Sequence, residues 1–360
     1  MAVAAALAFA LGASAGSGGD GGSGGGGQTP ERGTAGAGVP AGLSLERAVG
    51  ELMIVRFEGA RVPAYVRGLL RDGRASGAIL FADNLGPAGA RGTTRVLQRA
   101  ARGGAIVATD DEGGEVTTVP TTPALPAASQ IAGDVAGLTR NAGADLRRAG
   151  VNVNLAPVAD IALPGSVMSG RAFSGSAEAV AAAVVAATRG YGAGRVGATL
   201  KHFPGFGRAT ANTDDAAVTI DASAAELETD LVPFHAAIEA GAPLIMASHA
   251  LYPALDRRRI ASQSAPILQG LLRRRLGFDG AVITDSIEAE AVTSRSSVEV
   301  AAQRSVEAGA DLILMTGRGS WIRIYPAMLA RARRDGVFRA KVEAAAARVI
   351  RFKRRLGLAT

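Results

Sequence analysis

Two observations predict that this chain folds as a (β/α)8 barrel of the TIM type. From Leu43 onward, short apolar runs alternate with longer, amphipathic stretches rich in Ala and Arg, which is the pattern of a parallel sheet with crossover helices. The second observation is that polar residues come after the carboxyl end of one apolar run after another. A doubly wound open sheet is the alternative, but no G-x-G-x-x-G turn follows the first run.

The eight predicted strands are short apolar runs. They lie at residues 52–55, 78–81, 105–108, 151–155, 196–200, 244–247, 281–284 and 312–315. Amphipathic stretches between these runs predict helices at residues 63–71, 93–102, 134–149, 177–191, 224–240, 266–276 and 297–308. This alternation accounts for a complete barrel without a second domain.

A polar or charged side chain follows each of the first seven predicted strands. In chain order these are Glu58, Asp83 with Asn84, Asp110 to Glu112, Asp160, Lys201 with His202, His249 and Asp285. The carboxyl ends of barrel strands lie at one face of the fold, where barrel enzymes hold their active sites. The sequence therefore predicts one polar mouth.

The composition excludes several classes of chemistry. The chain has 360 residues, a net charge of +7, no cysteine and three histidines, so disulfides, thiolate nucleophiles and a zinc site are not expected. Basic residues are scattered and aromatic residues make up only 4%, which argues against nucleic-acid binding. Attraction to an anionic wall polymer or to a membrane surface stays open.

The N-terminal segment resembles an export signal. Residues 1–15 contain an apolar run that ends in Ala13-Ser14-Ala15, an A-x-A cleavage pattern, and residues 16–42 are a linker rich in Gly, Ser and Pro. We expect export to the cell envelope or beyond, with the barrel domain at residues 43–360. If residues 1–15 are only an Ala-rich tail, the protein is cytoplasmic.

The remaining chemical groups are carboxylates and a few cations, the set used in glycoside hydrolysis. Asp285 directly follows the strand at 281–284 and is a candidate nucleophile, or alternatively the N-cap of a helix. Asp110 can accept hydrogen bonds from sugar hydroxyls, and the sequence offers donors to a sugar in Lys201, His202 and Arg171. No cofactor is expected.

The ordered motifs GAILFADN, ATDDEGGEV, GVNVNLAPVADI, GRAF, KHFPGFG and ITDS resemble glycoside hydrolase family 3, above all its single-domain bacterial β-N-acetylhexosaminidases. The resemblance covers residue 43 to about residue 358. It implies a TIM-type barrel in which Asp285 is the nucleophile that forms a glycosyl-enzyme. It also implies a set of residues that bind the sugar, namely Asp110, Arg171, Lys201 and His202.

The sequence departs from this family in the loop after KHFPG. The hexosaminidases carry an Asp-Ser-His triplet there, whose His is the acid/base, whereas the same positions counted from Lys201 hold Asn212, Thr213 and Asp214. One interpretation makes Asp214 or Asp215 the acid/base, because mutual repulsion raises the pKa of one of the pair. In a second interpretation the acid/base is missing, and the enzyme keeps only weak activity on substrates with good leaving groups. The third makes the protein a non-catalytic carbohydrate- or peptidoglycan-binding barrel.

The sequence as a whole predicts a monomeric, exported, retaining glycoside hydrolase that releases β-linked N-acetylglucosamine or a related sugar from cell-wall-type glycans. No nucleic-acid partner and no stable membrane insertion are expected. A β-glucosidase-like specificity is an alternative that rests on the lost hexosaminidase loop signature. Glu115 and Thr118 are two further differences that bear on the substrate, since they stand where the hexosaminidases tend to have arginines.

Overall fold

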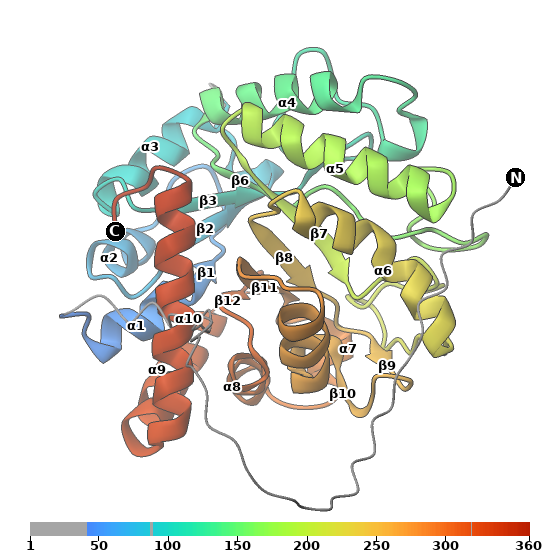
Figure 1. The fold of residues 1–360 in the computed structure, drawn as a ribbon. Coiled ribbons are helices and arrows are strands. Elements are labelled where there is room, and N and C mark those ends of the chain that lie inside the picture. Colours follow the sequence, from blue (N-terminus) through green and yellow to red (C-terminus); the bar gives the residue numbers. More distant parts are fainter. Residues whose placement is uncertain (1–41, 87–88, 318) are drawn as a thin grey trace, which may run out of the picture. The chain divides into compact units, whose positions relative to one another are not determined.

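The computed structural model describes residues 42–86, 89–317 and 319–360, and within them eight parallel strands close into a barrel (Figure 1). The export signal predicted at 1–15, and the predicted linker up to residue 41, lie outside the described residues. The barrel strands are β1 (Met53–Val55), β2 (Gly77–Leu80), β3 (Ile106–Thr109), β6 (Val153–Asn154), β7 (Gly197–Phe203), β8 (Leu244–Ala247), β11 (Ala281–Ser286) and β12 (Leu312–Leu314). Each overlaps a predicted strand, so the barrel prediction is confirmed.

Helices follow the strands around the outside of the barrel (Figure 1). They are α1 (Leu45–Glu51), α2 (Ala64–Arg71), α3 (Arg91–Ala100), α4 (Val135–Ala149), α5 (Ala177–Ala193), α6 (Ala224–Glu239), the π-helix η4 (Pro266–Arg275), α7 (Glu290–Thr293), α8 (Val298–Ala308), α9 (Ser320–Arg334) and α10 (Gly336–Arg355). Single 3₁₀ turns occupy η1 (Ala82–Asn84), η2 (Ala128–Gln130) and η3 (Ala261–Gln263). All seven predicted helices are present, and η4 is wound more widely than the expected α-helix.

Two small antiparallel hairpins, which the sequence patterns do not predict, interrupt the alternation. They are β4 (Asp111–Gly113) with β5 (Val116–Thr117), and β9 (Leu251–Tyr252) with β10 (Asp256–Ile260). Gly113 and Gly114 form the first turn with φ of 94° and 60°. A Cβ on Gly113 would lie 2.1 Å from the carbonyl oxygen of Pro126, so only glycine fits there. This hairpin turns the chain directly after the end of β3.

Alternate residues of the strands point inward and fill the barrel. The buried inward cluster includes Ile54, Ile79, Ile106, Val153, Leu244, Met246, Ile283 and Leu312. Val349 and Phe352 of α10 join this cluster, and a Cβ on Gly197, the first residue of β7, would lie 3.5 Å from the Phe352 ring. Helix α10 therefore covers the amino-terminal end of the barrel, which leaves the carboxyl end for the polar mouth.

A buried ion pair attaches α10 to the chain just before β1. Lys353 Nζ lies 2.7 Å from Glu51 Oε2, and both residues are 4% exposed. Ser76 Oγ donates a further hydrogen bond of 3.2 Å to the same oxygen. A buried carboxylate that loses its buried cation is strongly destabilising, because its desolvation is no longer compensated. The second cation near Glu51 is a weaker partner, since Arg47 is half-exposed and its Nε lies 3.6 Å from Glu51 Oε1.

We expect Lys353→Met to lower the free energy of unfolding by about 3 kcal/mol or more, measured by urea denaturation. The matched control is Arg339→Met, also on α10, whose exposed pair with Glu343 should contribute less than about 1 kcal/mol. The double variant Glu51→Gln/Lys353→Met should recover much of the loss. Equal effects of the two single variants would contradict this account of the buried pair.

Within the described ranges, none of the helices combines the length and the apolar character that a membrane-spanning segment requires.

Candidate active site

The carboxyl ends of the strands surround a cavity of about 710 Å³. Its walls include all six residues that the sequence singled out, namely Asp110, Arg171, Lys201, His202, Asp214 and Asp285. These residues come from five separate places in the chain, and the barrel brings them together. Asp214 and Asp215 are both exposed, but only Asp214 lines this cavity.

Lys201 and His202 are neighbours within β7, yet both side chains line the cavity. Adjacent side chains of a regular strand point to opposite faces. The pairing of β7 with β8 is irregular between Leu200 and Phe203, as in a β-bulge, and such irregularities redirect side chains next to active sites. The strand also extends to Phe203, so the Lys-His pair lies inside its last part and not in the following loop.

A cluster of ion pairs fixes one side of the cavity. Lys201 Nζ lies 2.6 Å from Asp110 Oδ1 and 2.7 Å from Glu112 Oε1. Arg171 binds Glu112 with both arms of its guanidinium, at 2.8 Å from Nε and 2.6 Å from Nη2. Burial opposes the ionisation of Glu112, but the charges of Lys201 and Arg171 hold its pKa at about 2. The cluster is thus rigid and carries fixed charges.

A second carboxylate orients the imidazole of His202. Asp160 is fully buried, and its Oδ2 lies 2.8 Å from His202 Nδ1. Its Oδ1 accepts the backbone N–H groups of His202 at 3.0 Å and Phe206 at 2.7 Å. Nδ1 must donate to Asp160, because the carboxylate can only accept, so Nε2 is the nitrogen left for a ligand in the cavity.

Asp285 lies at the end of β11 with one oxygen held by the backbone. The Ser286 N–H donates to Asp285 Oδ1 at 2.8 Å. Burial raises the pKa of Asp285, but His202, His249, the Ser286 N–H and Lys201 together outweigh it, so the net pKa lies below the usual value. The side chain is therefore an ionised carboxylate at neutral pH. The alternative N-cap role is wrong, because the next helix, α7, begins only at Glu290 after Ala289.

Buried His249 supports the strand end that carries Asp285. Its Nε2 lies 2.9 Å from the carbonyl oxygen of Ser286, and its Nδ1 lies 2.7 Å from Ser262 Oγ. A carbonyl can only accept, so Nε2 carries the proton and Nδ1 accepts from the serine. Burial lowers the pKa of His249, which favours this neutral form.

The loop after His202 folds back onto the element that follows Asp285. The first two N–H groups of α7, those of Glu290 and Ala291, donate to the carbonyl oxygens of Asp214 and Thr213 at 3.1 and 3.0 Å. These are helix N-terminal donors without a partner inside the helix, so the loop satisfies them. The result places Asp214 in the wall of the cavity that also contains Asp285.

Asp214 differs electrostatically from Asp285. Partial burial, and then the negative charge of Asp285, raise the pKa of Asp214 above its usual value. Asn212 Oδ1 accepts the Asp214 N–H at 3.2 Å, which helps to hold the turn. The surroundings thus shift the pKa values of the two carboxyl groups in opposite directions, downward for Asp285 and upward for Asp214.

Sequence reasoning left Glu112 and Asp160 out of the candidate site residues. Both residues follow predicted strands, and this position is the feature of the sequence from which they could have been predicted as site residues. Spacing along the chain does not show that Glu112 pairs with Arg171, which is 59 residues away, or that Asp160 contacts His202, which is 42 residues away. These two carboxylates position the predicted binding residues.

The chain matches the family model described as the glycosyl hydrolase family 3 N terminal domain over residues 44–352. An uncharacterized secreted glycosyl hydrolase of Arthroderma benhamiae is 35% identical over 309 residues, covering 79% of this chain and 86% of that protein. The β-N-acetylhexosaminidase of Beutenbergia cavernae superimposes with a TM-score of 0.80 at 33% identity, covering 86% of this chain and 98% of that one. A glycoside hydrolase family 3 β-N-acetylglucosaminidase of Paenibacillus sp. str. FPU-7 superimposes equally well, with a TM-score of 0.80 at 31% identity. That match covers 88% of this chain but only 63% of the Paenibacillus chain.

Proposed function

Because the chain belongs to glycoside hydrolase family 3, we propose that it releases β-linked N-acetylglucosamine or a related sugar from cell-wall-type glycans by a retaining mechanism. The observation that carries this proposal is the pair of carboxyl groups in one cavity. Their surroundings shift the two pKa values apart, since the pKa of Asp285 is lowered and that of Asp214 is raised. A retaining hydrolase needs such a difference between its nucleophile and its proton donor.

In the proposed reaction, Asp285 attacks the anomeric carbon while Asp214 gives its proton to the departing glycosidic oxygen. The glycosidic bond breaks, and a covalent bond forms between the sugar and Asp285. Asp214, now ionised, takes a proton from water, and that water displaces Asp285 with a second inversion. Asp215 is not proposed for this role, because it does not line the cavity.

The ion-pair cluster supports a subsite for the sugar beside Asp285. Lys201 and Arg171 carry permanent charges and present donors, and Asp110 keeps one carboxylate oxygen beyond its bond to Lys201. His202 adds Nε2, fixed by Asp160. Donors and acceptors held in fixed positions suit sugar hydroxyls, which act as both acceptor and donor.

Hydrolysis of p-nitrophenyl β-N-acetylglucosaminide and of p-nitrophenyl β-glucoside tests the proposal. Faster release from the acetamido sugar, with retention in the first product seen by NMR, supports it. Preference for the glucoside would replace it with the β-glucosidase-like specificity. If neither sugar is cleaved but N-acetylglucosamine binds in calorimetry, the protein is a non-catalytic binder. The secreted relative supports an exported enzyme, which fractionation of the expressing cells would test.

We expect activity to peak on the acidic side of neutrality. The pKa of Asp285 is lowered, so its charged form persists down to low pH, whereas Asp214 works while it is protonated. As pH rises through the raised pKa of Asp214, the proton donor is lost and kcat/KM falls. A pH profile of p-nitrophenol release checks this expectation. A profile that instead rises steadily toward alkaline pH would contradict the assignment of Asp214 as acid.

A further inference from the structure

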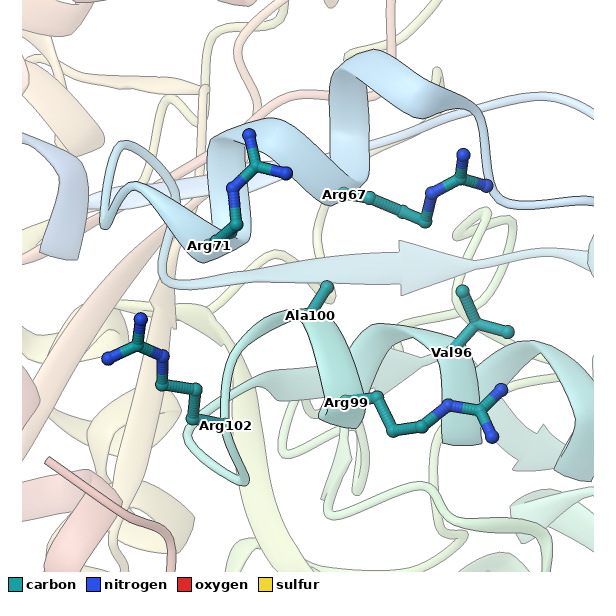
Figure 2. A pocket seen from close by; sticks show the side chains of 6 residues that line it. All are labelled: Arg67, Arg71, Val96, Arg99, Ala100 and Arg102. Atoms are coloured by element: carbon teal, nitrogen blue, oxygen red, sulfur yellow. The ribbon is translucent and has the colours of Figure 1, made fainter.

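A groove between α2 and α3, away from the mouth of the barrel, gathers four arginines (Figure 2). Arg67 and Arg71 extend from α2, Arg99 extends from α3, and Arg102 lies in the turn that follows α3. All four side chains are exposed, and the groove has a volume of about 570 Å³. In the sequence these residues are scattered, so only the fold creates the cluster.

The positive charge in this arginine groove is largely uncompensated. Among the described residues, no carboxylate pairs with Arg67, Arg99 or Arg102, and Asp72 is shared between Arg71 at 3.2 Å and Arg74 at 2.8 Å. Many other surface arginines do have a partner; the guanidinium groups of Arg275, Arg323, Arg331, Arg333 and Arg339 each bind a glutamate. Guanidinium groups stay charged at any physiological pH. Four such charges around one groove, largely without counter-charge, therefore attract an anion.

The positive charge continues along α3. Arg91, Arg95 and Arg99 recur every four residues, and the adjoining hollow that contains them is also lined by Arg147 and Arg148 of α4. Four residues of α-helix rise about 6 Å, so these guanidinium groups form a row with roughly that repeat. A ligand that follows this row needs a negative charge at a similar spacing.

We propose that the arginine groove binds a polymer of polyol units joined by phosphodiesters and carrying no bases. A phosphodiester presents two oxygens to the planar guanidinium fork. A three-carbon polyol phosphate has six backbone bonds per repeat, as many as two peptide residues, so its charges lie about 7 Å apart when extended. The groove floor is aliphatic, formed by Val96 and Ala100, and the side chains that line the groove include no aromatic ring on which a base could stack.

This site is separate from the catalytic cavity, since the two sets of lining residues have no member in common. A chain bound along α3 therefore leaves the barrel mouth free. The groove would keep the enzyme on an anionic polymer of the cell envelope while the active site works on a neighbouring glycan.

Fluorescence anisotropy with labelled poly(glycerol phosphate) as the probe tests the proposal, at about 0.15 M salt. Arg67→Gln/Arg99→Gln should weaken binding roughly 10- to 100-fold and reduce the slope of log K against log salt by about 1.4. The matched control is Arg257→Gln/Arg258→Gln, which removes the same two charges from exposed β10. That variant should bind within about twofold of the unaltered protein. Both variants should cleave small aryl glycosides at the unaltered rate.

Arg67→Lys/Arg99→Lys keeps the charge but loses the planar fork, and its affinity should lie between those of the unaltered protein and the Gln variant. Equal weakening by the groove and control variants would overturn the proposal in favour of general charge attraction. Tighter binding of single-stranded oligothymidylate would assign the groove to nucleic acid, and binding only to vesicles with anionic lipid would assign it to a membrane. No binding of the probe by the unaltered protein would also overturn the proposal.

Discussion

Asp285→Asn is expected to lower kcat for aryl β-N-acetylglucosaminides by roughly 10⁴- to 10⁶-fold, because the amide cannot form the glycosyl-enzyme. The side chain lies at the end of β11, its surroundings favour the ionised form, and the Ser286 N–H holds one oxygen. The expected loss appears even with a good leaving group, since the nucleophile is needed whatever the aglycone. Steady-state release of p-nitrophenol and of 2,4-dinitrophenol measures it.

A folding control separates loss of chemistry from loss of structure. Asp285→Asn has the same size and shape, so its circular dichroism and thermal transition should stay close to those of the unaltered protein. Asp83→Asn changes another carboxylate in the same cavity wall and should affect kcat far less. Mass spectrometry after incubation with a slow fluorinated aryl glycoside should find the sugar on the peptide containing Asp285. Substantial turnover by Asp285→Asn would rule out this nucleophile.

Barrel strands such as β2 and β8 could be predicted because they are buried on both faces and are therefore continuous apolar runs. The helices α9 and α10 were not among the predictions. Their many arginines pair with carboxylates distant in the sequence, as Arg333 does with Glu46 and Arg348 with Asp311. Burial of such residues depends on the partner, and a local pattern of apolar residues does not reveal it.

Four of the predicted site residues share a feature that the sequence reveals, which is their place at the carboxyl end of a strand; they are Asp110, Lys201, His202 and Asp285. Arg171 and Asp214 lie in longer connecting segments. What sequence could not supply was the course of the loop between His202 and Asp214. That course depends on two backbone hydrogen bonds to the N-terminus of α7, and backbone groups are the same in every residue. The electrostatic difference between Asp214 and Asp285 likewise follows from burial and neighbours in space.

The sequence resemblance predicts that Asp214 stands where the hexosaminidases of the family have a histidine, and such a change would alter the chemistry of proton transfer. A histidine can be a proton donor near neutral pH without special surroundings, whereas a carboxyl needs its pKa raised. Here partial burial and the charge of Asp285 act in that direction. After the first step Asp285 is covalently bound and uncharged, so the pKa of Asp214 should fall, which suits its second role as a base.

The effect of Asp214→Ala on the rate of cleavage is therefore expected to depend on the leaving group of the substrate. Loss of a general acid costs roughly 10²- to 10⁴-fold for p-nitrophenyl β-N-acetylglucosaminide, whose leaving group benefits from protonation. 2,4-Dinitrophenolate departs without protonation, so the glycosyl-enzyme should still form from that substrate at close to the unaltered rate. Its formation should be seen as a burst of released 2,4-dinitrophenol. Hydrolysis of that intermediate then becomes limiting, because the base is missing. Stopped-flow release of both phenols measures the split.

The neighbouring Asp215→Ala is the matched control, because it removes an exposed carboxylate of the same loop that does not line the cavity. Asp215→Ala should cleave both substrates at rates within about twofold of those of the unaltered protein. Azide, a small anion that needs no base, should accelerate Asp214→Ala by forming a β-glycosyl azide and should have little effect on Asp215→Ala. If both variants slow the two substrates alike, or if azide rescues neither, the proton donor is not Asp214 and the cavity works without a carboxyl acid.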